Sequence, residues 1–101
     1  MMKVTVLYGH PASPDEFEKY YGSTHLPLAA KTKGMARIEL TKFVAASDGG
    51  KPAFYRMAEL YFTTQAEMEQ SMGSAEGKAM VADLANFATG GVTVVIGSVE
   101  R

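Results

Sequence analysis

Cysteine is absent from this chain of 101 residues. Its absence excludes disulfides, thiolate nucleophiles and zinc or iron–sulfur sites built on cysteine, so a redox role would need a borrowed cofactor. An excess of one charge is also missing, because 10 basic and 11 acidic residues leave a formal net charge of -1. Without a basic surface to bind phosphates, we expect neither nucleic acid nor a membrane surface as a partner.

Targeting and nucleotide-binding signals are missing as well. The first residues lack the apolar core and cleavage site of a secretory signal, and no apolar run could cross a bilayer, so we expect a cytoplasmic protein. No glycine-rich loop joins a strand to a helix in a phosphate-binding pattern, which argues against an NAD-linked reductase. With 47% hydrophobic and 21% charged residues, the composition is that of a globular protein, and residues 1–101 are predicted to form one domain.

The residue pattern predicts the order strand, helix, strand, strand, helix, strand. Alternating or clustered apolar residues between turn residues predict strands over 3–8, 35–44, 54–62 and 92–96. Ser13 and Pro14 are typical of a helix start, whereas Pro27 should end or kink that helix. Thr64 and Ser74 are predicted to begin two later helical segments.

This order indicates an α+β, ferredoxin-like βαββαβ fold. Right-handed crossovers place the helices on one face of a four-stranded antiparallel sheet and leave the other face uncovered. One side of the two middle strands carries large apolar residues, namely Met35, Phe43, Tyr55, Met57 and Tyr61. The other side is small or aliphatic, so neither is polar enough to face water, and we expect a homodimer that packs sheet against sheet.

Several segments occur together in a spacing typical of one protein family. They are Val6-Leu7-Tyr8, Pro14-Asp15 with Phe17, Tyr20-Tyr21, His25-Leu26-Pro27-Leu28, residues 58–62, and residues 83–87 ahead of Gly90-Gly91. Through them, nearly the whole chain resembles the EthD-like proteins of the dimeric α/β-barrel superfamily. The resemblance implies a homodimer with a pocket between the sheet and helices of each subunit. Relatives include cofactor-free monooxygenases, lactone isomerases, polyketide cyclases and haem-degrading enzymes, and the EthD-like branch is linked to ether breakdown, so the fold alone selects no reaction.

His25 and Tyr21 are the predicted catalytic residues. His25 matches the family's histidine in the His-x-Pro-Leu position, and imidazole moves protons near neutral pH. The alternative is a histidine that caps a helix C-terminus, where the helix dipole favours positive charge. Tyr21 lies one helical turn earlier and could orient a ligand or stabilise an enolate, or simply pack in the core. We expect no cofactor, because cofactor-binding motifs are missing, and no metal shared with His25, because His10 should lie in a surface loop at the opposite end of the subunit.

Other residues are predicted to bind the ligand, which we expect to be a small, mostly apolar organic molecule. Glu59 would be costly to bury unless paired, so it could orient His25, pair with Arg37 or Arg56 across the strands, or lie at an exposed edge. Asp83 and Asn86 could bind a substrate or form the polar flank of the last helix. The predicted ligand-binding set is Tyr8, Tyr20, Glu59, Tyr61, Asp83, Asn86 and Phe87.

Two functions stay open on the sequence alone. The first is an EthD-like catabolic or accessory enzyme, in which His25 assists proton transfer during isomerisation, cyclisation or oxygenation. The second is a non-catalytic protein that binds a small hydrophobic product or supports a partner oxidoreductase. The position of His25 separates them, because a ring bonded to helix carbonyls and turned away from any cavity would favour the second.

Overall fold

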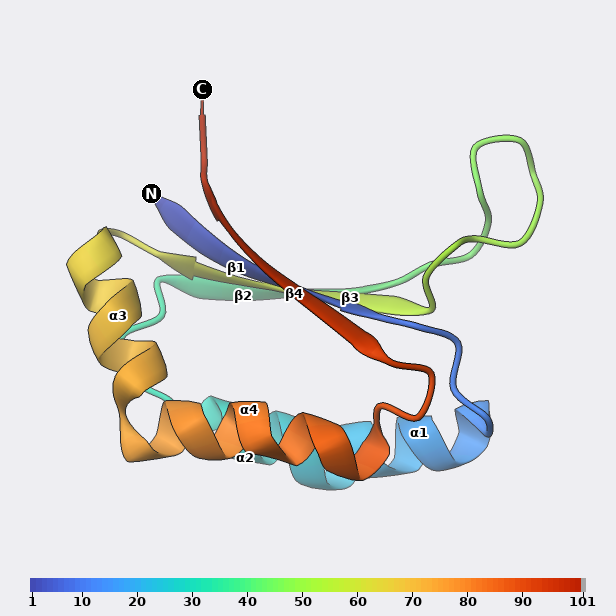
Figure 1. Ribbon diagram of the computed structural model, residues 1–101, viewed down its shortest axis with the longest axis horizontal. Coiled ribbons are helices and arrows are strands. Elements are labelled where there is room, and N and C mark those ends of the chain that lie inside the picture. The colour runs from blue at the N-terminus through green and yellow to red at the C-terminus, as the bar shows by residue number, and fades with distance from the viewer. Residues whose placement is uncertain (101) are drawn as a thin grey trace.

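A sheet covered by helices on one face forms the structure, a computed structural model that describes residues 1–100 (Figure 1). Its elements are β1 Met2–Tyr8, α1 Pro14–Tyr20, η1 Tyr21–His25, α2 Leu26–Ala30, β2 Arg37–Lys42, β3 Arg56–Phe62, α3 Gln65–Gly73, α4 Ala75–Phe87 and β4 Val92–Ser98. All strand pairs are antiparallel, in the order β2-β3-β1-β4. The predicted ferredoxin-like fold is confirmed. Within residues 1–100, no helix combines the length and apolar character needed to span a membrane.

The predicted helix starts are also confirmed. Each capping hydroxyl accepts a bond from the backbone N–H three residues later, at 3.4 Å for Ser13, 3.2 Å for Thr64 and 3.1 Å for Ser74. These bonds satisfy amides that have no partner inside the first turn of a helix. The middle strands are shorter than predicted, because β2 begins at Arg37 and β3 at Arg56. The residues between them form a long loop that projects beyond the sheet (Figure 1).

Pro27 does not end the helical run, which corrects the prediction that the helix ends there. Proline lacks an N–H and its ring crowds the carbonyl four residues earlier. The chain accommodates it with the π-helical segment η1, in which the Leu26 N–H bonds to the Tyr21 carbonyl five residues back. Helical backbone therefore continues from Pro14 to Ala30, and His25 lies inside this run instead of at its terminus. Both Tyr21 and His25 are buried on the side of η1 that meets the sheet.

The hydrophobic core lies between the helices and one face of the sheet. Alternate residues of β1 and β3 point into it, as the period of two in a strand requires. The buried core residues from the central strands are Val4, Val6, Tyr8, Ala58, Leu60 and Phe62. The helices contribute Phe17, Tyr21, Ala29, Met68, Met80, Leu84 and Phe87. The helices therefore all pack on this one face, and a functional side chain that a helix directs toward the sheet lies on this side.

The uncovered face of the sheet is more polar than predicted. Lys3 and Glu59 form an ion pair of 2.7 Å across β1 and β3. Arg37 pairs with Glu39 at 3.0 Å along β2, and its guanidinium lies 4.1 Å from the ring centre of Tyr61. The aliphatic stems of neighbouring cationic side chains cover the ring, so Tyr61 is buried although no helix packs on this face.

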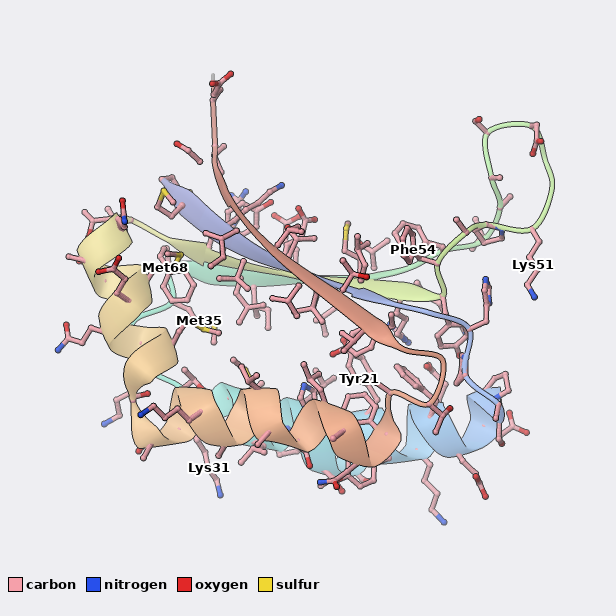
Figure 2. The ribbon with its side chains drawn as sticks, viewed as in Figure 1. Tyr21, Lys31, Met35, Lys51, Phe54 and Met68 are labelled. Atoms are coloured by element: carbon pink, nitrogen blue, oxygen red, sulfur yellow. The ribbon has the colours of Figure 1, made fainter. Side chains whose placement is uncertain are left out.

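Two of the large residues predicted to share one side of the middle strands with Tyr61 lie on the helix side, whereas Tyr61 lies on the uncovered face. Tyr55 precedes β3 in a bend, where strand alternation does not apply, and its ring centre lies 5.1 Å from that of Phe17 on α1. Its hydroxyl donates to Glu18 at 3.1 Å. Met35 precedes β2 and packs against the core, on the side of the sheet that faces the helices (Figure 2). The prediction extended the two strands too far, so it carried their alternation into residues that do not follow it.

Candidate functional site

A small apolar cavity lies between the helices and the sheet. Its free volume is about 30 Å³, which is room for roughly two water molecules. Its lining has no lysine, arginine, aspartate or glutamate, and its polar side chains are Tyr8, Tyr21 and His25. The flexible thioethers of Met72 and Met80 form part of the wall and can repack around a larger guest. The chemistry of the lining therefore suits an uncharged, mostly apolar molecule.

His25 connects this cavity to a buried carboxylate on α4. Its Nδ1 lies 2.9 Å from Oδ2 of Asp83, and both side chains are less than a tenth exposed. The His25 ring bonds to no helix carbonyl among the described residues, so the helix-capping alternative does not hold. The ring lines the cavity and packs against Phe87, with the two ring centres 4.6 Å apart.

Asp83 is held as an anion by three hydrogen bonds. Besides His25, its carboxylate accepts the Tyr20 hydroxyl at 2.6 Å and the Asn86 amide at 2.9 Å, both on Oδ1. Burial favours the neutral acid, but the bonds donated to the carboxylate outweigh it, so the pKa of Asp83 lies below its usual value. An ionised carboxylate can only accept, so the proton of this contact belongs to Nδ1 of His25. In the neutral ring Nε2 is then left as an acceptor.

Tyr21 brings a second polar group to the cavity, one turn before His25. Its ring stacks on the His25 ring at a centre distance of 5.9 Å and an interplanar angle of 14°. The guanidinium of Arg56 lies 5.0 Å from its ring centre on another side. Within residues 1–100 the Tyr21 hydroxyl is buried and has no hydrogen-bond partner. Figure 2 shows Tyr21 in the layer between helices and sheet.

The predicted site residues fall into three places. Tyr8, Tyr21 and His25 line the cavity, and Asp83 lies behind His25. Tyr20, Asn86 and Phe87 line a separate surface cleft beside α1, although the Phe87 ring also packs against His25. Glu59 and Tyr61 lie on the opposite face of the sheet from the cavity, since their β3 neighbours Ala58 and Leu60 form its wall.

The paired charges also differ from the sequence prediction. Glu59 pairs with Lys3 and not with Arg37 or His25. A pair that sequence reasoning missed joins Arg56 to Glu18, with the Arg56 Nε–H donating to the carboxylate at 2.9 Å. This hydrogen bond holds the pKa of Glu18 below its usual value despite partial burial. Nothing in the local sequence marks the pair, because its members are 38 residues apart.

Residues 1–100 contain no group of three or more histidine, aspartate and glutamate side chains placed to hold a metal ion. His10 lies half-buried in the loop after β1, where its Nε2 donates to the Pro52 carbonyl at 2.7 Å. The cavity walls include Met72, Met80 and Leu26, which the sequence indicated only as core residues or not at all. Apolar periodicity identifies the buried face of a helix but not the space left beside it.

Comparison with known proteins gives consistent results. Residues 9–91 match the EthD domain family. The chain is 42% identical over 95 residues to an uncharacterized 11.0 kDa protein of the thcB-thcC intergenic region of Rhodococcus erythropolis, which covers 94% of this chain and 91% of that protein. It is similar to an ethyl tert-butyl ether d (ethd) family protein from Bacillus halodurans, with a TM-score of 0.92 and 33% identity over 99% of both chains.

Two more distant crystal structures share the fold. A cofactor-independent oxygenase from Streptomyces nogalater has a TM-score of 0.66 at 15% identity, over 99% of this chain and 92% of that one. A dimeric protein of unknown function and ferredoxin-like fold from Bacteroides fragilis has a TM-score of 0.65 at 16% identity, over 97% and 95% of the two chains. At these identities the likeness concerns the fold alone.

Proposed function

Since this chain belongs to the EthD domain family, we propose that it is a small-molecule enzyme in which His25 transfers protons to and from a mostly apolar organic ligand. One observation carries the proposal: Nδ1 of His25 is bonded to the buried Asp83 carboxylate while its ring lines an apolar cavity. A carboxylate in this position fixes the ring orientation and stabilises the imidazolium that forms when the ring takes a proton.

The proposed chemistry begins with Nε2 of His25 acting as a general base. A proton leaves a C–H or O–H group of the ligand for Nε2, and the electron pair stays on the ligand as an enolate or phenolate. The resulting imidazolium lies beside the Asp83 anion in a site shielded from water, where the attraction is stronger than at the surface. Return of the proton to another ligand atom completes an isomerisation or a cyclisation. In an oxygenation, the ligand anion would instead react with dioxygen.

The test is turnover by the wild-type protein and two histidine variants on lactones, polyketide-like phenols and quinols. We expect His25→Ala to lower any detected rate by about 10²–10⁴-fold, the usual contribution of a general base. His10→Ala is the matched control, because His10 is the chain's other histidine and lies outside the cavity lining. Turnover that is unchanged in His25→Ala would contradict the catalytic role. Ligand binding without turnover in the wild-type protein would favour the non-catalytic alternative.

The family relationship also supports a homodimer formed through the uncovered face of the sheet. On this face Arg37 and Lys3 lie in one cross-strand row, and Glu39 and Glu59 lie directly opposite each other in the next row. A row of cations beside a row of anions becomes self-complementary when a second copy is turned about a two-fold axis. A dimer would also cover Val95, which is 50% exposed on the same face.

The dimer is tested by light scattering at micromolar protein concentration. Val95→Lys places a charge on the proposed contact and should weaken association. Val44→Lys makes the same change in the loop after β2, where the valine is 93% exposed, and should leave the mass unchanged. A wild-type protein that is monomeric across this range would contradict the proposal.

A further inference from the structure

The Tyr21 hydroxyl is a buried polar group without a partner among the described residues, and its side chain lines the mostly apolar cavity together with Tyr8 and His25. Tyr21 is 2% exposed, and no described residue accepts from or donates to its hydroxyl. Burial raises the pKa of Tyr21 to about 12, so the group carries its proton at neutral pH and remains a donor. Buried polar groups in native proteins nearly always have a partner, so an unpaired one needs an explanation, such as a bound water or a role toward a ligand.

The surroundings of Tyr21 prevent its hydroxyl from finding a partner by rotation. The rings of Tyr8 and Phe17 pack against it at centre distances of 5.7 and 5.4 Å, and His25 stacks on it. Arg56, the nearest charged group over the ring, is already bonded to Glu18. The ring is therefore fixed with its hydroxyl free, which is the state expected of a preorganised donor.

We propose that the Tyr21 hydroxyl donates a hydrogen bond to the carbonyl oxygen of an uncharged ligand, such as a ketone or a lactone. This inference rests on the proposed function, because it places the ligand carbonyl beside Nε2 of His25. The Tyr21 hydroxyl requires an acceptor on the ligand. A carbonyl oxygen can accept this bond and, unlike a hydroxyl, carries no proton that would need a further partner. A carboxylate or phosphate does not fit, since the cavity lining has no lysine or arginine.

The arrangement also matches the chemistry of a carbonyl compound. Removal of a proton from the carbon next to a carbonyl moves negative charge onto its oxygen. In the proposed complex, the Tyr21 hydroxyl bonded to that oxygen stabilises the charge as it develops, while His25 takes the proton. The proposal thus assigns the two polar groups of η1 complementary positions on one ligand, with Tyr21 at the oxygen and His25 at the adjacent carbon.

The test compares acetophenone with α-methylstyrene, in which a CH₂ group replaces the carbonyl oxygen. Affinities are measured by NMR titration of backbone amides in the wild-type protein and in Tyr21→Phe, with cyclohexanone and δ-valerolactone as further carbonyl probes. We expect the wild-type protein to prefer acetophenone. Tyr21→Phe should weaken acetophenone binding by about 2- to 10-fold, the effect of one neutral hydrogen bond, and leave α-methylstyrene binding unchanged. The ¹³C resonance of labelled acetophenone should also move less on binding to Tyr21→Phe.

Tyr55→Phe is the matched control, because its hydroxyl bonds to Glu18 and does not line the cavity. It should leave both affinities unchanged, and thermal unfolding checks that each variant is folded. Equal binding of ketone and alkene, no binding of any carbonyl probe, or an unchanged ketone affinity in Tyr21→Phe would overturn the proposal. These outcomes concern binding only. A catalytic failure of His25 would instead appear as unchanged turnover in His25→Ala, so the two proposals fail separately.

Discussion

Polar groups have opposite surroundings on the two faces of the sheet. Toward the helices, nearly everything is apolar, and the buried anion Asp83 has its hydrogen bonds fully supplied by neighbouring side chains. On the uncovered face, charges are many and lie in exposed or half-exposed pairs such as Arg37 with Glu39. Shielding from water strengthens each interaction in the first environment, and solvent and salt weaken those in the second. The difference explains why the candidate chemistry lies on the helix side.

Within the helix side, neighbouring residues can still differ in whether their polar group is paired, as Tyr20 and Tyr21 show. The Tyr20 hydroxyl donates to Asp83 at 2.6 Å, outside the cavity. The Tyr21 hydroxyl is buried at the cavity and has no partner among the described residues. One tyrosine therefore bonds to Asp83, the partner of His25, and the other has the free hydroxyl that we propose for a ligand.

The sharpest test of the comparison between faces uses two leucines. Leu60 on β3 is 3% exposed in the core, and Leu7 on β1 is half-buried on the uncovered face. Leu60→Ala should lower the free energy of unfolding by about 2–5 kcal/mol, because it leaves a cavity in a packed core. Leu7→Ala should cost less, and by an amount that rises with protein concentration if a second copy covers this face. Urea denaturation at two concentrations measures both, and equal costs would remove the distinction between the faces.

Local patterns predicted most of the fold but only part of the site. Hydroxyl caps at Ser13, Thr64 and Ser74 are short-range signals, so the helix starts were correct. The pairing of His25 with Asp83 joins residues 58 positions apart and depends on how α4 packs against η1. The π-helical turn that places His25 inside a helix results from a balance between Pro27 and tertiary packing, which a proline rule based on α-helices cannot capture.

Acid should reveal the buried anion of the helix side. The pKa of Asp83 is lower in the folded protein than its usual value of 3.8. Its contribution to stability is therefore fully present above about pH 4 and is lost as pH falls through the folded pKa. Asp83→Asn should be less stable than wild type by about 1–3 kcal/mol at pH 7, and the two stabilities should converge in strong acid. The other acidic residues are common to both proteins, so the difference between the two urea curves reports Asp83. A difference that stays constant down to pH 2 would contradict this assignment.

The smallest effect is expected from the ion pair on the uncovered face. Lys3 Nζ lies 2.7 Å from the Glu59 carboxylate, and its side chain is 34% exposed. Such pairs contribute little, because water still reaches the lysine and ordering its side chain costs entropy. Lys3→Met should therefore change the urea midpoint of the monomer hardly at all, and raising the salt concentration should remove what difference remains. A large, salt-resistant loss that grows with protein concentration would instead mean that a second subunit shields this pair from water, which would make the two faces of the sheet alike in the assembled protein.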